Sequence, residues 1–199
     1  MLEILIKNGI YPDYEKKEMV KANIGIQDGK IAYIGQETPE AARVIEAEGK
    51  VVSPGFIDIH MHEEDFVHEG KQFIIANMML EMGVTTAVGG NCGVQKQPLS
   101  IFKSVLNELG GSPVNYLILA GYNHFRTELG IGRYAHPSQA QMDELQAIMK
   151  RELAEGAYGI SFGIEYDPGI TYDEMLWAVR ASDDPHLLVS AHYRDETKK

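Results

Sequence analysis

Two histidines separated by one residue are the first groups in this sequence that could do chemistry. They are His60 and His62, in the segment Asp58-Ile59-His60-Met61-His62. Side chains alternate across a strand, so on a strand both imidazoles share one face and can converge on one metal ion. A surface pair, or a pair satisfied in the core, produces the same pattern about as often. Position favours a site, because parallel α/β folds build their sites at the carboxyl ends of strands.

The single cysteine, Cys92, lies in the glycine-rich segment Gly89-Gly90-Asn91-Cys92-Gly93. It has three interpretations: a small buried hydrophobe, which is the commonest, a nucleophile that needs a nearby base, or a deprotonated metal ligand. With His60 and His62 on the neighbouring predicted strand, metal ligation ranks above the nucleophile. His192 follows an apolar run at the end of another predicted strand, so three strand ends present ligands that suit zinc.

A competing motif is Gly159-Ile160-Ser161-Phe162-Gly163, which fits the nucleophile elbow of serine hydrolases. That elbow requires a sharp strand-to-helix turn at the serine. Here apolar residues continue through Ile164, and the breaker Asp167-Pro168-Gly169 comes only later. Ser161 is therefore predicted to lie within a strand. His124 directly follows another predicted strand, so it could lie at the same end of the sheet as the other histidines.

An alternation of apolar strands and amphipathic helices must position these groups. Strands are predicted over 56–60, 84–88, 114–120, 158–164 and 187–192, and helices over 72–82, 99–109, 139–155 and 172–181. Ser138 and Thr171 are predicted N-caps, and a long loop is predicted from the third strand to Pro137. Strands that alternate with helices indicate right-handed βαβ units and a parallel sheet.

Residues 1–54 differ, because short strands separated by turns follow one another there. Gln27-Asp28-Gly29-Lys30 is typical of a tight hairpin turn, and Ser53-Pro54-Gly55 ends the pattern. We therefore expect two domains, a small N-terminal β module over 1–54 and a βα domain over 55–199.

Composition excludes several classes of protein. The chain has 199 residues, of which 44% are hydrophobic and 24% charged. This is enough for one hydrophobic core with a small additional module, and it excludes a disordered or collagen-like protein. A net charge of −11 provides no basic patch, so neither nucleic acid nor a membrane is expected as a partner. No apolar run approaches the roughly 18 residues of a membrane span. The charged start is unlike a signal peptide, and one cysteine cannot form an internal disulfide, so we expect a cytoplasmic protein.

The segment Pro54-Gly55-Phe56-Ile57-Asp58-Ile59-His60-Met61-His62 resembles the opening strand of the amidohydrolase superfamily. Further segments resemble the N-acyl-D-amino-acid deacylases, or D-aminoacylases, of that superfamily: Gly90-Asn91-Cys92-Gly93, Gly156-Ala157-Tyr158-Gly159-Ile160-Ser161, Glu165-Tyr166-Asp167-Pro168-Gly169 and Ala191-His192-Tyr193-Arg194-Asp195-Glu196. The resemblance runs from end to end. It implies a (β/α)8 TIM barrel with a metal site at its mouth, preceded by a small β-sandwich module.

The resemblance also implies an activity, which is zinc-dependent hydrolysis of an N-acyl-D-amino acid to a carboxylate and a free D-amino acid. Residues that match Cys92 and His192 hold zinc in that family, together with a histidine from strand six. The pair that matches His60 and His62 joins Cys92 at a second, weaker metal position. An aspartate from strand eight is the usual general base, and it is expected beyond residue 199.

Two departures from the family concern substrate binding. Relatives read His-Asn where this chain has Tyr122-Asn123-His124, so the role of His124 stays open. Glu165 stands where relatives tend to carry an apolar residue that touches the substrate side chain, and Tyr166 is retained beside it. One hypothesis is that Glu165 disfavours acidic D-residues and favours neutral or basic ones. The alternative is that Glu165 pairs with a local arginine.

Two other functions are carried as alternatives. One is a cyclic amidase related to dihydroorotase or hydantoinase, against which Cys92 and the missing carboxylatable lysine count. The other is a non-catalytic fragment with vestigial ligands. At roughly 30 residues per unit, 55–199 supplies about five of the eight units of a barrel. The isolated chain is therefore expected not to turn over substrate, and its open sheet edges to need the rest of the barrel or an oligomer partner.

Overall fold

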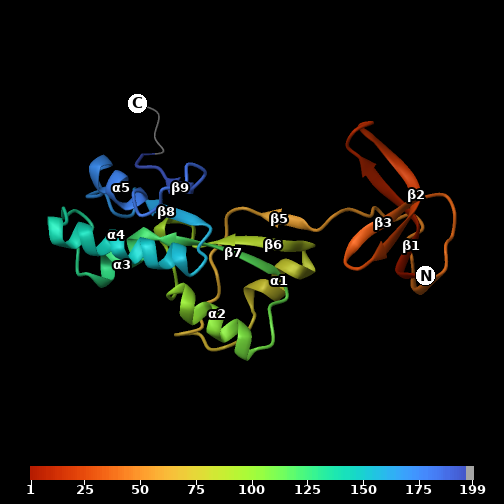
Figure 1. Cartoon of the computed structure of the whole chain (residues 1–199), viewed down its shortest axis with the longest axis horizontal. Coiled ribbons are helices and arrows are strands. Elements are labelled where there is room, and N and C mark those ends of the chain that lie inside the picture. The colour runs from red at the N-terminus through yellow and green to blue at the C-terminus, as the bar shows by residue number, and fades with distance from the viewer. Residues whose placement is uncertain (196–199) are drawn as a thin grey trace. The chain divides into compact units, whose positions relative to one another are not determined.

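The computed structural model describes residues 1–195 and divides the chain into two compact units, with the boundary between Pro54 and Gly55 (Figure 1). The last residue of the predicted motif over 191–196, Glu196, lies outside the described residues, as does the end of the predicted second domain, 196–199. Among the helices of the described part, none combines the length and apolar character needed to cross a bilayer.

The first unit is a single four-stranded sheet. Its strands are β1 (Leu2–Asp13), β2 (Glu18–Gln27), β3 (Lys30–Gly35) and β4 (Ala41–Glu46), in the order β3-β2-β1-β4. Asp28 and Gly29 both have positive φ, 53° and 68°, as a type I′ hairpin turn requires, which confirms the turn predicted between β2 and β3. All four strands pair with one another in a single sheet, so residues 1–54 form one β-sheet layer. The two layers that the predicted sandwich requires are not present within these residues.

The second unit contains a five-stranded sheet, in which every neighbouring pair is parallel. The strands, in spatial as well as sequence order, are β5 (Phe56–Asp58), β6 (Val84–Gly89), β7 (Asn115–Gly121), β8 (Gly159–Gly163) and β9 (Leu188–His192). Ile57 of β5 and Val189 of β9 line the same cavity of about 430 Å³, so the sheet curves around an open interior. The predicted parallel strands are confirmed as part of a barrel. Within the described residues, β9 is not followed by a helix, so only four of the predicted β-α units are complete.

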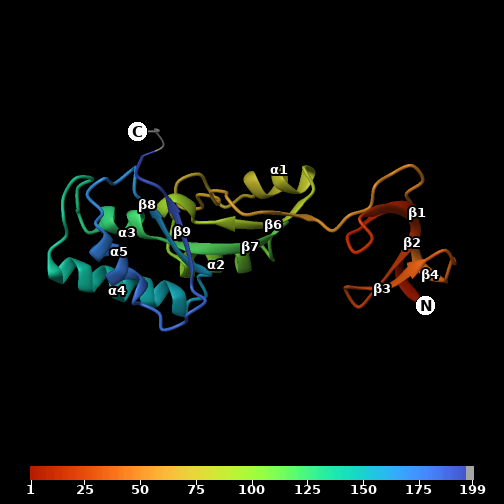
Figure 2. The same ribbon diagram turned by 90° about the horizontal axis from the view of Figure 1, so that it is seen from above.

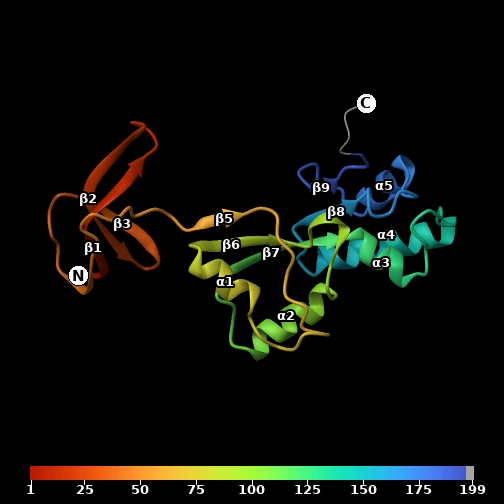
Figure 3. The ribbon, with the colours of Figure 1, turned by 180° about the vertical axis from the view of Figure 1, so that it is seen from behind.

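Five helices connect these strands. They are α1 (Ile75–Glu81), α2 (Leu99–Glu108), α3 (Tyr122–Glu128), α4 (Gln139–Ala154) and α5 (Tyr172–Val179). Figures 1 and 2 show α1 and α2 beside β6 and β7, and Figure 3 shows α5 next to β8 and β9. The predicted long loop before Pro137 is wrong, because α3 occupies its first part. This helix is stabilised by distant partners, such as Glu174 for Arg126, and a local sequence pattern does not reveal them.

Both predicted helix caps are confirmed. The Ser138 hydroxyl accepts a hydrogen bond from the backbone N–H of Gln141, and the Gln141 side chain accepts one from the Ser138 N–H, which completes a capping box before α4. The Thr171 hydroxyl accepts from the Glu174 N–H at 3.1 Å and begins α5. These caps fix where α4 and α5 start.

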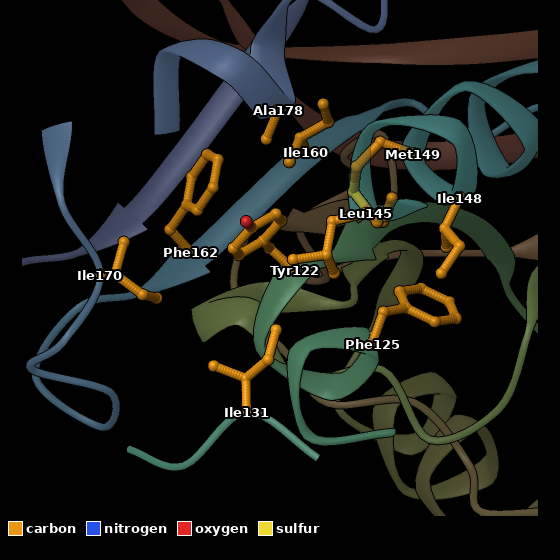
Figure 4. Packing of buried hydrophobic residues seen from close by; sticks show 11 residues of the cluster. Tyr122, Phe125, Ile131, Leu145, Ile148, Met149, Ile160, Phe162, Ile170 and Ala178 are labelled. Carbon is orange, nitrogen blue, oxygen red and sulfur yellow. The ribbon is translucent and has the colours of Figure 1, made fainter. Parts of the chain in front are cut away.

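The largest core cluster packs α3, α4 and α5 against the outer face of β8 (Figure 4). Its buried residues are Ala120, Tyr122, Phe125, Ile131, Leu145, Ile148, Met149, Ile160, Phe162, Ile170 and Ala178. The rings of Tyr122 and Phe162 are 5.0 Å apart, centroid to centroid. Because Ile160 and Phe162 of β8 point into this core, Ser161 between them points to the opposite face of the sheet.

Candidate metal centre

The four predicted metal ligands all lie near the carboxyl ends of strands in the second unit. The predicted strand over 56–60 ends at Asp58, whose carboxylate accepts a hydrogen bond from the His60 N–H at 2.9 Å, so His60 and His62 follow β5 and do not lie on it. Cys92 lies in η1 (Asn91–Gly93), a short 3-10 turn after β6. His192 is the last residue of β9. Since the strands are parallel, these ends meet at one edge of the sheet. Alternating strands and helices thus bring together residues that are up to 132 positions apart in sequence.

The Cys92 thiol lies between two imidazoles. Its Sγ is 3.2 Å from Nε2 of His60 and 3.7 Å from Nδ1 of His192. The ligand atoms of His60, His62 and Cys92 all lie within 4.8 Å of one another. A sulfur and a nitrogen bound to one tetrahedral zinc ion lie roughly 3.5 Å apart, given the usual bond lengths. The observed separations and the mixed thiol and imidazole donor set therefore fit zinc.

Burial shifts the pKa of two of these donors. Desolvation lowers the pKa of His62, so its imidazole is kept in the neutral form that binds metal ions. Desolvation also raises the pKa of the Cys92 thiol, and the hydrogen bond with Tyr166 opposes that shift. A metal ion that binds Cys92 must therefore displace the thiol proton.

Cys92 occupies a tight left-handed turn, with φ 58° and ψ 26°. The glycines on either side have no space for a side chain. A Cβ on Gly90 would lie 2.0 Å from the carbonyl oxygen of Leu119, and one on Gly93 would lie 1.8 Å from Oδ1 of Asn123. The glycine-rich sequence therefore lets the loop press against β7 and α3, and Cys92 takes a conformation that non-glycine residues seldom adopt.

Ser161 of β8 connects the two ends of this loop. Its side chain is 0% exposed, and its Oγ accepts a hydrogen bond from the Gly93 N–H at 3.0 Å. The Ser161 hydroxyl in turn donates to the carbonyl oxygen of Gly90. The Gly-x-Ser-x-Gly segment is part of a strand, as predicted, and its serine supports the loop that carries Cys92.

We expect Ser161→Ala to weaken zinc binding by roughly 10-fold or more, as is typical when a group that orients a metal ligand is lost. The physical reason is that Gly90 and Gly93 lose their shared partner, so Cys92 is held less firmly. Competition with a chelator of known affinity measures the dissociation constant. Ser100→Ala is the matched control, because Ser100 is exposed on α2. A folded Ser161→Ala protein with the affinity of the parent chain would show that this hydroxyl does not position Cys92.

Two buried asparagines were missed by the sequence analysis. Nδ2 of Asn91 donates to the carbonyl oxygen of Val88 at 2.8 Å, and its Oδ1 accepts from the Ser190 hydroxyl at 3.2 Å. Asn123 exchanges two hydrogen bonds with the backbone of Gly163, at 2.8 and 2.9 Å. Asn91 follows β6 and Asn123 follows β7, and their side chains hydrogen-bond the segments after these strands to residues of β6, β8 and β9. Each is the direct neighbour of a predicted site residue, which is the one signal that the sequence offers for them.

A cleft of about 770 Å³ opens beside Cys92. Its lining consists of Cys92, Gly93, Val94, Gln95, Asn123, His124, Thr127, Glu128, Arg133, Tyr166 and Asp167. Two of the residues predicted to touch substrate, Tyr166 and His124, are in this lining, and Nε2 of His124 lies 3.5 Å from a carboxylate oxygen of Glu128. Arg133 was missed, because it lies in a loop without a recognisable motif. Its Nε donates to the Tyr166 carbonyl oxygen at 2.6 Å.

Glu165, the third residue predicted to touch substrate, contacts a predicted metal ligand. Its Oε2 lies 2.7 Å from Nε2 of His192, and this pair replaces the local arginine considered from the sequence. The Tyr166 hydroxyl lies 3.3 Å from Nδ1 of the same ring. His192 is therefore held by neighbours on both of its ring nitrogens.

Comparisons with known proteins agree with this arrangement. A family model described as the amidohydrolase family matches residues 51–199. The D-aminoacylase of Alcaligenes xylosoxydans xylosoxydans is 26% identical, over 98% of this chain and 45% of its own length. A structure of N-acyl-D-glutamate deacylase from Bordetella bronchiseptica, complexed with zinc and a phosphonate inhibitor, has a TM-score of 0.82 at 27% identity, and the match covers 98% of this chain and 46% of that one.

A solved D-aminoacylase with a binuclear metal centre has a TM-score of 0.84 at 25% identity, and the match covers 98% of this chain and 46% of that one. The chain thus spans less than half the length of the relatives that it matches. Its likeness to them extends along nearly all of its own residues, and the family model covers the whole parallel sheet. The chain therefore belongs to the amidohydrolase family.

Proposed function

We propose that this protein is a zinc-dependent hydrolase of N-acyl-D-amino acids, in which water and the amide give a carboxylate and a free D-amino acid. The observation that carries the proposal is the buried Cys92 thiol, held between His60 and His192 beside the cleft. When bound, zinc would supply a water that is nucleophilic at neutral pH and would polarise the scissile carbonyl. The names of the relatives, D-aminoacylase and N-acyl-D-glutamate deacylase, support the substrate class.

The residues would divide the metal binding between two positions. Cys92 and His192 would hold the tighter zinc ion, and His60 and His62 would join Cys92 at a second, weaker position. The place of the Cys92 sulfur, within 4 Å of both His60 and His192, supports its sharing between the two. We propose that a further histidine and the general-base aspartate come from outside these 199 residues.

Substrate is proposed to bind in the cleft beside Cys92. Arg133 supplies a guanidinium to its lining, and this cation can pair with the carboxylate that every N-acyl amino acid carries. Tyr166 lines the same cleft next to His192, so it can contact the acyl amide close to the metal ligands. His124 also lines this cleft, with its Nε2 3.5 Å from a carboxylate oxygen of Glu128.

The two edge strands of the parallel sheet, β5 and β9, are proposed to be covered in the working protein. Apolar side chains of both edge strands are exposed in the open interior of the sheet, among them Ile57 on β5 and Val189 on β9. Exposed apolar surface and unpaired strand edges promote association, so we propose that further strands of the barrel or an oligomer partner cover them. The cytoplasmic location stays a prediction.

The test is zinc quantitation together with a panel of N-acetyl-D-amino acids, N-acetyl-L-amino acids and cyclic amides. It uses the 199-residue chain and the same chain with its natural downstream sequence. We expect the longer form to hydrolyse the D-substrates, to lose that activity with a chelator and to regain it with zinc. The 199-residue chain should bind zinc without turnover.

Each other result would contradict one part of the proposal. Hydrolysis of the L-substrates alone would reject the substrate class, and hydrolysis of cyclic amides alone would favour a cyclic amidase. Turnover by the 199-residue chain would show that it already contains every group that the reaction needs. A chain without zinc, whose stability does not change with a chelator, would favour the non-catalytic alternative.

A further inference from the structure

The Glu165 carboxylate and the His192 ring form a hydrogen-bonded pair next to the Cys92 thiol. The distance from Oε2 of Glu165 to Nε2 of His192 is 2.7 Å. An ionised carboxylate only accepts hydrogen bonds, so Nε2 must carry the proton in this pair. The lone pair of the neutral ring is then on Nδ1, which is the nitrogen that lies 3.7 Å from the Cys92 sulfur.

The backbone places the two residues together. Gly163, at the end of β8, pairs with His192, at the end of β9, and the Ile164 N–H donates to the His192 carbonyl oxygen at 2.9 Å. Glu165 follows in a turn that the Asp167 N–H closes by donating to the Gly163 carbonyl oxygen. This register brings the Glu165 side chain to the far nitrogen of the ring.

We infer that Glu165 is a positioning residue, which fixes the tautomer and the orientation of His192 so that Nδ1 is the metal-binding nitrogen. The inference rests on the proposed function, because it assigns His192 to the metal. Metal-binding histidines commonly donate their other N–H to a carboxylate, and loss of that partner typically costs 10- to 100-fold in metal affinity. This role differs from selecting the substrate side chain, which the sequence alone suggested for Glu165.

We expect the Glu165–His192 pair to contribute little to the free energy of unfolding. The Glu165 side chain is 47% exposed, and exposed ion pairs contribute little to the free energy of unfolding. A variant of Glu165 should therefore fold normally. Any loss of metal affinity then reports on the orientation of His192 and not on unfolding.

The experiment compares Glu165→Ala and Glu165→Gln with the parent protein in its full natural chain. Chelator competition gives the zinc dissociation constant, and the ¹⁵N chemical shifts of the His192 ring in the metal-free protein give its tautomer. We expect Glu165→Ala to weaken zinc binding 10- to 100-fold and to reduce the population with the proton on Nε2. Glu165→Gln should lose less, because its amide oxygen still accepts from Nε2.

Asp65→Asn is the matched control, because Asp65 also pairs with a histidine, His68, at 2.9 Å but outside this site. It should leave zinc affinity unchanged. An unchanged zinc dissociation constant and tautomer in Glu165→Ala would overturn the inference. The assay needs no substrate, so a parent protein that binds zinc but does not cleave N-acyl-D-amino acids would reject the proposed activity and leave this inference standing.

Discussion

Replacing Cys92 by alanine is expected to lower zinc affinity by more than about 100-fold, because loss of a direct ligand should exceed the 10- to 100-fold cost of losing an outer contact. The Cys92 sulfur lies within 4 Å of both His60 and His192, so its removal weakens both proposed metal positions together. The remaining imidazoles, of His60, His62 and His192, then lack the sulfur donor that lies beside them in the parent chain.

The measurement is zinc content after dialysis, followed by chelator competition for the dissociation constant. His68→Ala is the control, since His68 is an exposed histidine that is not among the clustered ligands. It should keep the zinc content of the parent chain. A Cys92→Ala protein that retains zinc with the parent's dissociation constant would contradict the metal centre and, with it, the proposed function.

Replacing Arg126 by methionine is expected to destabilise the fold by about 3–5 kcal/mol, the usual cost of leaving one member of a buried ion pair alone. The Arg126 side chain is completely buried, and its Nε donates to Oε1 of Glu174 at 2.8 Å. Further hydrogen bonds run from its guanidinium to the carbonyl oxygens of Gly132 and Ala135. Without Arg126, the buried Glu174 carboxylate keeps one side-chain donor among the described residues, the Tyr122 hydroxyl at 3.0 Å.

Burial raises the pKa of Tyr122, so this hydroxyl keeps its proton and cannot take the place of a positive charge. Urea unfolding followed by circular dichroism measures the loss. Lys150→Met is the control, because Lys150 is exposed on α4, and we expect it to change stability by less than about 0.5 kcal/mol.

The double variant Arg126→Met, Glu174→Leu should recover part of the lost stability, since it removes the unpaired Glu174 carboxylate, while the buried Asp167 carboxylate, 4.0 Å from Nη1 of Arg126, keeps its hydrogen bond from Nδ2 of Asn123. A loss below about 1 kcal/mol in Arg126→Met would show that Glu174 is compensated in another way. Because Arg126 is on α3 and Glu174 is on α5, the pair also connects these two helices.

The parts of the fold that the sequence predicted are those governed by local patterns. The strands and four of the helices follow from apolar periodicity, and the starts of α4 and α5 follow from Ser138 and Thr171. Helix α3 escaped prediction because it buries polar residues, Asn123 and Arg126, whose side-chain partners Asp167 and Glu174 lie 44 and 48 positions away. No local pattern distinguishes such a helix from a polar loop.

In the candidate site, too, features set by local patterns could be predicted and features set by long-range contacts could not. His60, His62, Cys92 and His192 could be placed together because the carboxyl ends of parallel strands always meet at one edge. The partners of those residues could not be predicted, since they depend on side-chain geometry across the sheet. Ser161 resembled a nucleophile in sequence, and only its contacts with Gly90 and Gly93 reveal a supporting role. Glu165 likewise resembled a substrate contact until its distance to His192 was known.

The contacts of the Cys92 loop have a consequence for the order of events during synthesis. Ser161 lies 68 residues after Gly93, and His192 lies 100 residues after Cys92. At the usual translation rate of roughly 5–20 residues per second, His192 leaves the ribosome about 5–20 s after Cys92. His60 and His62 emerge before either. A growing chain therefore contains every donor of the proposed weaker metal position before His192 of the tighter position has been synthesised. During translation, the weaker position can thus bind zinc before the tighter position is complete.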